Sequence, residues 1–288
     1  MHRGFAVAAL LVSMLRSTGS PAAEGPHLRV VATFSTLGSL VRAVAGPSVA
    51  VSDFVPVGAS PEDYQPTPSD IRTLHQADLL FENGGGMETW LQRTVDNAKN
   101  PHLRITGLSD GLPIRGGNPH LWMDPVLAKR YVTKIADALS VADPAGRSGY
   151  EARGRAFNAQ LDHLRREIAH QIATIPPAHR TMIVFHNAWQ YYNDRFGIRT
   201  VGVIELSPGQ EPSPKYIAEL VALAKQNHVR AVFAEPEYSP KLVQALAESA
   251  GITTVENLYD DSLSAGPAVR DYPSMLRYDT RTIVKALR

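Results

Sequence analysis

Five histidine, aspartate and glutamate residues lie in four segments that each follow a predicted β-strand: Glu62, His120, His186 and the adjacent pair Asp260 and Asp261. Neutral imidazole suits zinc and iron, and carboxylate oxygen extends the range of ions towards manganese. Two carboxylate charges would also balance a divalent cation, which matters in a cleft where unpaired charge is expensive. Two imidazoles and two carboxylates therefore predict a site for a divalent transition metal.

No single one of these residues is diagnostic of a metal site. The chain has ten histidines, and a lone histidine after a strand is more often held by packing or hydrogen bonds than by a metal. The strong His-Glu-x-x-His and paired-cysteine signatures are missing from the sequence. Glu235 and Glu237, after another predicted strand, suit either a cleft or a solvated edge. Asp124, Asn187 and Glu235 are candidates for orienting the metal ligands through hydrogen bonds.

The hydrophobic pattern alternates strands and helices in both halves of the chain. In the first half, strands are predicted at residues 28–34, 49–55, 79–81 and 103–106, with helices at 35–44, 66–77 and 87–98. In the second half, strands are predicted near residues 181–185, 201–206, 229–234 and 253–258, and helices near 187–196, 214–226, 240–250 and 273–287. This alternation predicts an α/β fold with two four-stranded, mainly parallel sheets flanked by helices.

A helix at residues 125–139 and a much longer helix separate the two halves. Apolar residues recur at gaps of three, four or seven from Tyr150 to Ile172, before Pro176 ends the pattern. We predict one helix of about 30 residues, or about 45 Å at 1.5 Å per residue. Such a helix is too long for one lobe, so we expect it to bridge two. The expected division is a signal peptide at 1–22, an N-terminal α/β lobe at 23–142, the connecting helix at 143–175 and a C-terminal α/β lobe at 176–288.

The parallel sheets explain how distant residues could meet at one site. In open parallel sheets, ligands bind in the crevice at the carboxyl ends of the strands. Two such crevices that face each other would bring the residues after four different strands together. We therefore expect the metal in a cleft between the two lobes.

The beginning of the chain and its composition indicate export. An apolar run at residues 5–15 and a following stretch of small residues are typical of a secretory signal peptide, with cleavage expected after Ala22. The apolar run is about half of what a helix needs to cross a bilayer core of ~30 Å. Residues 1–22 hold two of the 29 Lys+Arg and none of the 28 Asp+Glu, so the mature chain has one acid in excess. No basic surplus remains for nucleic acid or anionic lipid.

Cysteine is absent from the 288 residues. Disulfides, thiolate metal sites and a lipid-modified N-terminal cysteine are therefore not expected. Hydrophobic residues make up 44% and charged residues 20%, which is ordinary for a globular protein and not for a disordered or multi-span membrane protein. We expect a periplasmic protein that has no lipid anchor and does not span the membrane.

Six segments, in this order, resemble those of one known family. They are residues 61–70 (PEDYQPTPSD), 83–90 (NGGGMETW), 118–125 (NPHLWMDP), 185–197 (FHNAWQYYNDRFG), 208–215 (PGQEPSPK) and 258–262 (LYDDS). In them the chain resembles the metal-binding solute-receptor family of bacterial ABC importers for zinc, manganese and ferrous iron. The resemblance covers nearly the whole mature chain. It implies two α/β lobes bridged by a single long helix, with the metal in the cleft between the lobes.

The resemblance also implies a ligand set, with one departure from the family pattern. His120, His186 and Asp261 match the second, third and fourth ligand positions, and Asp260 is one residue off. The family usually has histidine at the first position, where this chain has Glu62. Histidine at the third position accompanies zinc in the family, so zinc is narrowly favoured. Manganese or ferrous iron follows closely, because two histidines and two carboxylates match the composition of those sites.

The expected function is that of a monomeric periplasmic receptor, not an enzyme, which captures the metal and delivers it to the membrane permease of an ABC transporter. Other functions stay open on the residues alone. A secreted metallohydrolase would need an open coordination position and a general base. An adhesin or other interaction protein of the same fold would bind its partner without metal. A receptor that has lost its metal through the change at Glu62 is a further alternative.

Overall fold

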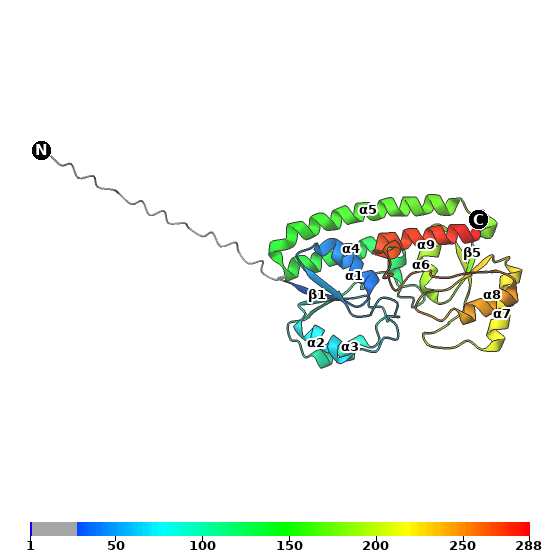
Figure 1. Ribbon diagram of the computed structural model, residues 1–288, viewed down its shortest axis with the longest axis horizontal. Coiled ribbons are helices and arrows are strands. Elements are labelled where there is room, and N and C mark those ends of the chain that lie inside the picture. The colour runs from blue at the N-terminus through cyan, green and yellow to red at the C-terminus, as the bar shows by residue number, and fades with distance from the viewer. Residues whose placement is uncertain (2–27) are drawn as a thin grey trace.

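The computed structural model describes Met1 and residues 28–288. Apart from Met1, the predicted signal peptide therefore lies outside the described residues. The rest of the chain forms two lobes, each built on a four-stranded parallel sheet, with long helices running along one side of both (Figure 1). This arrangement confirms the predicted fold class.

The first sheet has the order β2-β1-β3-β4. Its strands are β1 (Arg29–Ala32), β2 (Ala50–Asp53), β3 (Leu79–Glu82) and β4 (Arg104–Gly107), and its helices are α1 (Ser35–Ala45), α2 (Pro68–Gln76) and α3 (Leu91–Ala98). Val30, Val31 and Leu80 are all buried, as expected for central parallel strands that are covered on both faces.

The second sheet has the order β6-β5-β7-β8 and is also parallel throughout. Its strands are β5 (Thr181–Val184), β6 (Arg199–Val203), β7 (Ala231–Phe233) and β8 (Thr253–Val255), and its helices are α6 (Gln190–Phe196), α7 (Pro214–Gln226) and α8 (Lys241–Ala250). In both sheets the crossovers place the loops that follow the strands at one edge.

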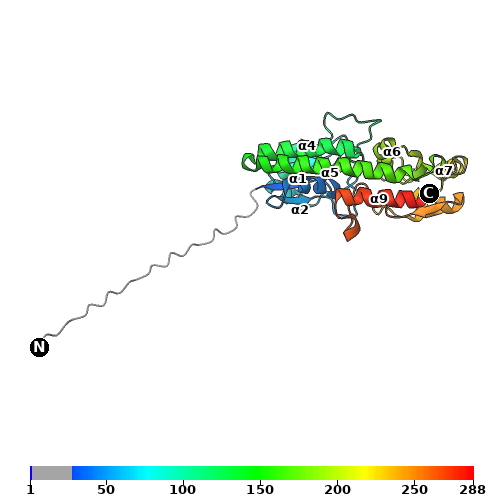
Figure 2. The same ribbon diagram turned by 90° about the horizontal axis from the view of Figure 1, so that it is seen from above.

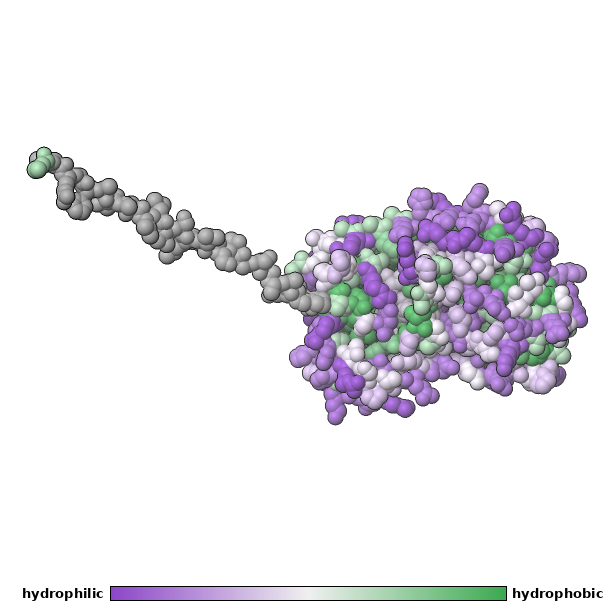
Figure 3. All heavy atoms as spheres, in the orientation of Figure 1, coloured by the Kyte–Doolittle hydropathy of each residue, from purple (hydrophilic) through white to green (hydrophobic). Residues whose placement is uncertain are grey.

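Three further helices lie along this side of the lobes: α4 (Pro125–Ala142), α5 (Arg147–Ala173) and α9 (Tyr272–Leu287). Helix α4 packs against α1 and α5, whereas α9 contacts both α1 of the first lobe and β8 of the second. The 27 residues of α5 span about 40 Å at 1.5 Å per residue. The helix packs against α1, α4 and α9, extends over both lobes in Figure 1 and lies beside α4 and α9 in Figure 2. Its buried residues include Tyr150, Leu161 and Ile172, whereas its outer side is hydrophilic (Figure 3).

Some helix and strand ends differ from those predicted. The long helix starts at Arg147 because Pro144–Gly146 forms a short 3-10 turn. Helix α3 starts at Leu91 and not at residue 87, because the buried Glu88 carboxylate accepts hydrogen bonds from the N–H groups of Asn83 (2.8 Å) and Gly84 (3.0 Å). These bonds hold the segment before α3 in a turn.

The two lobes share one continuous hydrophobic core, which includes residues of both sheets. Polar contacts also join them: Tyr272 Oη donates to the carbonyl of Trp122 at 2.5 Å, and Arg195 Nη2 is 2.7 Å from Asp124 Oδ2. Side-chain packing therefore fixes how the lobes sit against each other. None of the helices within residues 28–288 combines the length and the apolar character that crossing a membrane requires.

Candidate metal centre

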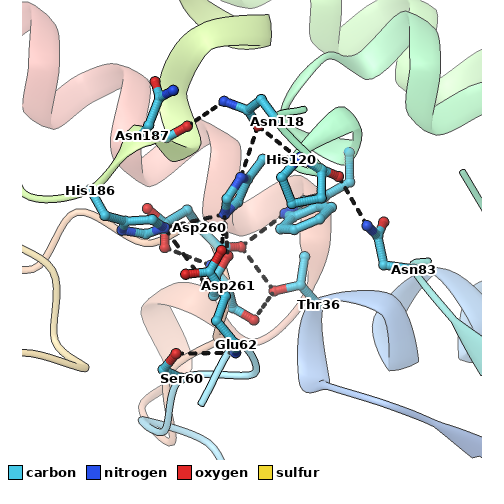
Figure 4. Close-up of polar contacts among 12 residues, drawn as sticks. Thr36, Ser60, Glu62, Asn83, Asn118, His120, His186, Asn187, Asp260 and Asp261 are labelled. Carbon is cyan, nitrogen blue, oxygen red and sulfur yellow. Dashed lines mark hydrogen bonds and ion pairs between the residues drawn. The ribbon is translucent and has the colours of Figure 1, made fainter. Parts of the chain in front are cut away.

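Three of the predicted ligands converge between the lobes (Figure 4). The Nε2 atoms of His120 and His186 are 3.2 Å apart, and Asp261 places Oδ1 3.5 Å from His120 Nε2 and Oδ2 3.7 Å from His186 Nε2. All three side chains are buried. Two nitrogens bound to a tetrahedral zinc ion at ~2.05 Å would lie roughly 3.3 Å apart, so the observed spacing suits one first-row cation.

Glu62 lies beside this group but is more exposed. Its Oε1 is 3.8 Å from His120 Nε2, and 13% of its side chain is exposed, against 3% for His120. It belongs to the irregular segment between β2 and α2, where its backbone N–H donates to Ser60 Oγ at 3.2 Å. Glu62 therefore offers a further carboxylate, from a segment outside the strands and helices in which the carbonyl of Pro61 accepts from Trp90 Nε1 at 2.8 Å.

Asn118 determines which nitrogen of His120 is free. Its Oδ1 accepts from both the backbone N–H (3.0 Å) and Nδ1–H (2.9 Å) of His120, while its Nδ2 donates to the carbonyl of Asn187 at 2.5 Å. Because Oδ1 can only accept, the proton of the neutral imidazole is on Nδ1. The lone pair of Nε2 then points to His186 and Asp261, as a metal ligand requires.

His186 has the same arrangement with a different partner. It follows Phe185 after the end of β5, and its Nδ1 is hydrogen-bonded to Oε2 of Glu235, which comes after β7; burial raises the pKa of Glu235 well above its ordinary value. A carboxylate on Nδ1 fixes the ring and makes Nε2 a better donor to a metal. His186 and Glu235 also form a second possible ligand group with Asp260, on the Nδ1 side of the ring.

The close approach of the two Nε2 atoms favours a proton or a cation between them. When both Nδ1 atoms are protonated in neutral rings, two lone pairs face each other across 3.2 Å and repel. A proton on one Nε2 relieves this repulsion through a hydrogen bond, and a cation relieves it by accepting both lone pairs. A bound metal ion would therefore take the place of a proton.

The neighbouring aspartates have different surroundings. Oδ1 of Asp260 accepts from the backbone N–H of Asp261 at 2.6 Å, and its Oδ2 accepts from Trp189 Nε1 at 3.1 Å. The carbonyl of Asp260 accepts from Trp122 Nε1 at 3.0 Å. Neither carboxylate oxygen of Asp261 has a hydrogen-bond partner among the described residues. Asp260 is therefore held by its neighbours, whereas Asp261 has both oxygens available for a cation.

Electrostatics disfavour charge in this group while no cation is present. Burial raises the pKa of Asp261 well above its ordinary value, and the carboxylates of Asp260 and Glu62 raise it further. Burial also raises the pKa of Glu62, although His186 opposes the rise. Burial lowers the pKa of His120 well below its ordinary value, and His186 lowers it further. A divalent cation would favour ionised carboxylates and neutral imidazoles together.

A cavity of about 170 Å³ adjoins the group and is lined by Glu62, His120 and His186. Glu205 lines the same cavity and was not predicted as a site residue. The sequence pattern placed it inside a strand at residues 201–206, but β6 ends at Val203. A carboxylate close to the end of a parallel strand was the signal that could have identified it.

Of the three residues predicted to orient the ligands, one contacts a ligand through its side chain and two have other contacts. Glu235 contacts His186 as expected. Asn187 contributes only its carbonyl, through Asn118. Asp124 instead caps α4 by accepting from the Val126 N–H at 2.9 Å, and it pairs with Arg195. The role of Asn118 was not predicted, although an asparagine two residues before a histidine is typical of a side chain that turns back to bond the following backbone.

Comparison with known proteins places the chain among metal-binding receptors. It is 32% identical over 269 residues to the manganese-binding lipoprotein MntA of Halalkalibacterium halodurans, covering 92% of this chain and 90% of the relative. It is 28% identical over 289 residues to the iron-binding protein YfeA of Yersinia pestis, covering 97% and 93%. The relative from H. halodurans is named a lipoprotein, whereas no lipid anchor was expected for this chain, which has no cysteine.

The chain is also similar to a solved structure and to a family model of periplasmic metal-uptake proteins. The crystal structure of ZnuA superimposes with a TM-score of 0.82 at 29% identity, covering 91% of this chain and 99% of that one. The model of the family described as "Zinc-uptake complex component A periplasmic" matches residues 30–286, which include every predicted metal ligand. The predicted resemblance is confirmed, and the chain belongs to the periplasmic zinc-uptake complex component A (ZnuA) family.

Proposed function

We propose that the chain is a periplasmic receptor that binds one divalent transition metal ion between its lobes and delivers it to the membrane permease of an ABC importer. The observation that carries the proposal is the convergence of the imidazole Nε2 atoms of His120 and His186 on the carboxylate of Asp261, which has no hydrogen-bond partner among the described residues. Glu62 would complete the ligand set. The names of the relatives, a manganese-binding lipoprotein and an iron-binding protein, support this kind of cargo.

The donor set favours zinc narrowly over manganese and ferrous iron. Two imidazoles suit zinc, while two carboxylates extend the range towards the harder ions. Divalent affinity of a given site generally rises from manganese through iron to zinc, so tight zinc binding alone would not identify the cargo. The informative quantity is the ratio of zinc to manganese affinity, compared with the same ratio for a variant in which Glu62 is histidine.

A binding role accounts for the site better than catalysis does. A catalytic zinc site keeps one coordination position for water beside a general base, whereas here two histidines and two carboxylates surround a single position. The chain would divide into lobes at residues 23–142 and 176–288, joined by the long helix. The same purified protein tests the rivals: hydrolysis of ester or peptide substrates would indicate a metallohydrolase, and binding of a macromolecule by the metal-free protein would indicate an adhesin.

Metal binding by the purified mature chain tests the proposal directly. Native mass spectrometry and calorimetry of the metal-free protein should show one Zn²⁺, Mn²⁺ or Fe²⁺ per chain. His120→Ala should weaken binding at least about 100-fold, because it removes a ligand from the centre of the group. His170→Ala is the matched control, since His170 is exposed on α5 and should leave affinity unchanged. Wild-type protein that binds no metal, or equal effects of the two substitutions, would overturn the proposal.

A further inference from the structure

Glu205 is a buried residue in which only one of the two carboxylate oxygens accepts a hydrogen bond. Its Oε1 accepts from the backbone N–H of Gly209 at 2.9 Å, but its Oε2 has no hydrogen-bond partner among the described residues. Only 8% of the residue is exposed. Buried polar atoms are normally paired, because an unpaired one lowers the stability of the fold. An unpartnered oxygen at this position therefore needs a reason.

The position of Glu205 supplies one. It lines the cavity of about 170 Å³ that also borders Glu62, His120 and His186. Burial raises the pKa of Glu205; the Gly209 N–H and His186 oppose the rise, while Asp63 and Glu62 add to it. The same imidazole and the same carboxylate that border the metal group thus act electrostatically on Glu205. A larger cavity that Glu205 also lines has no histidine among its lining residues.

We propose that Glu205 is a further carboxylate ligand for the divalent cation, which it contacts through Oε2 at the solvent side of the group. This inference rests on the proposed function. The next residue, Leu206, is 66% exposed, so Glu205 lies where the cavity wall reaches the surface. An ion that enters through the cavity would meet Glu62 and Glu205 before it reaches the imidazoles. An added oxygen donor favours manganese and ferrous iron, which accept more carboxylate ligands than zinc does.

The bond to Gly209 gives this contact a second consequence. It ties the carboxylate of Glu205 to the loop at residues 206–213, which connects β6 to α7. A cation held by Oε2 would therefore restrict this loop as well. The conformation of this surface loop would then differ between the metal-bound and the metal-free protein, and a permease that binds the loop could distinguish the two forms.

Two charge-neutralising substitutions separate coordination from general electrostatics. Glu205→Gln keeps an oxygen for the Gly209 N–H but removes the charge. Glu211→Gln removes the same charge from an exposed residue of the same loop, which does not line the cavity with the imidazoles. Affinities for Mn²⁺ and Zn²⁺ are measured by competition with a chromophoric chelator, and melting temperatures are measured without metal. We expect Glu205→Gln to weaken Mn²⁺ at least about 10-fold and Zn²⁺ less, with no fall in melting temperature, and Glu211→Gln to change both affinities less than about twofold.

Glu205→Asp provides a test that keeps the charge. The shorter side chain withdraws the carboxylate, so a direct ligand should lose Mn²⁺ affinity, whereas a distant charge should not. Wild-type affinity in Glu205→Asp, or equal effects of Glu205→Gln and Glu211→Gln, would overturn the inference. In that case the loss of binding in His120→Ala would still support the proposed function. Absence of metal binding by the wild type would instead remove the proposed function itself.

Discussion

Replacing Asp261 and Asp260 by asparagine, one at a time, should have opposite effects on the stability of the metal-free protein. The two residues are adjacent and equally buried, but only Asp260 is hydrogen-bonded through its carboxylate. Burial raises the pKa of both aspartates, so loss of a buried charge does not distinguish the two substitutions, whereas their hydrogen bonds do. Asp261→Asn adds an N–H donor that can reach the imidazole nitrogens, now 3.5 and 3.7 Å from the carboxylate oxygens.

The magnitudes follow from hydrogen bonds gained and lost. An unpartnered buried polar atom costs about 1–3 kcal/mol, so Asp261→Asn should stabilise the metal-free protein by about 1–2 kcal/mol. In Asp260→Asn, a single amide oxygen replaces two oxygens that accept from the Asp261 N–H and Trp189 Nε1. One donor then loses its acceptor, and the metal-free protein should become less stable by about 1–3 kcal/mol.

Chemical denaturation with and without metal tests both signs. A ligand present at 100 times its Kd stabilises the folded state by about 2.7 kcal/mol. The wild type should show this gain with Zn²⁺, whereas Asp261→Asn should show almost none at the same concentration. The combination of higher stability without metal and lost stabilisation by metal is specific to a ligand carboxylate. Destabilisation of the metal-free protein by Asp261→Asn, or full stabilisation of that variant by Zn²⁺, would refute the reasoning.

Four other predictions concern the surroundings of the site. Glu235→Gln should weaken metal binding about 10- to 100-fold in competition assays, since it removes the carboxyl group that orients His186, while unchanged affinity would rule out this role. Calorimetry in two buffers of different ionisation enthalpy should show release of at least one proton per metal bound, because the cation replaces the proton between His120 and His186 and favours ionisation of Asp261; no release would contradict this arrangement. Burial raises the pKa of Glu88 to about 7. The protonated carboxyl therefore stabilises the fold below about pH 4.5, and this contribution, up to about 3 kcal/mol, is lost as pH rises through 7. Glu88→Gln should flatten the dependence of unfolding free energy on pH, and an unchanged slope would refute the assignment. Crystals with and without metal should differ by only a few degrees of lobe rotation, because α5 and a continuous core join the lobes, and a rotation of tens of degrees would contradict this.

The sequence predicted the fold because its signals were local. Continuous apolar runs and the helical spacing of apolar residues recur in each strand and helix, and the spacing between Tyr150 and Ile172 identified the connecting helix. The positions of His120 and His186 followed from the same pattern, since both come after a strand of a parallel sheet. His186 comes shortly after the end of β5 at Val184, whereas His120 lies at the end of the longer segment that follows β4, and both segments can be located from the chain alone.

The choice between Asp260 and Asp261 could not be made from local pattern. It depends on Trp122 and Trp189, whose indole N–H groups bind Asp260 from segments more than 70 residues away. Glu205 was missed for a related reason: the apolar pattern continued past the real end of β6 at Val203. Side-chain direction at a strand end depends on packing between lobes, which periodicity does not report.

The structure separates the site into a fixed part and a part that can adjust. His120, His186 and Asp261 are held by Asn118, Glu235 and the buried Asp260, inside a core that both lobes share. Glu62 and Glu205, in contrast, belong to segments outside the strands and helices. In the proposed site, the fixed part would offer the same three donors to any first-row divalent ion. Selection among these ions would then depend largely on how many oxygens the outer carboxylates add. A chain with glutamate at position 62 supplies a negative oxygen donor there, and the discrimination between zinc and manganese should change most at these two carboxylates.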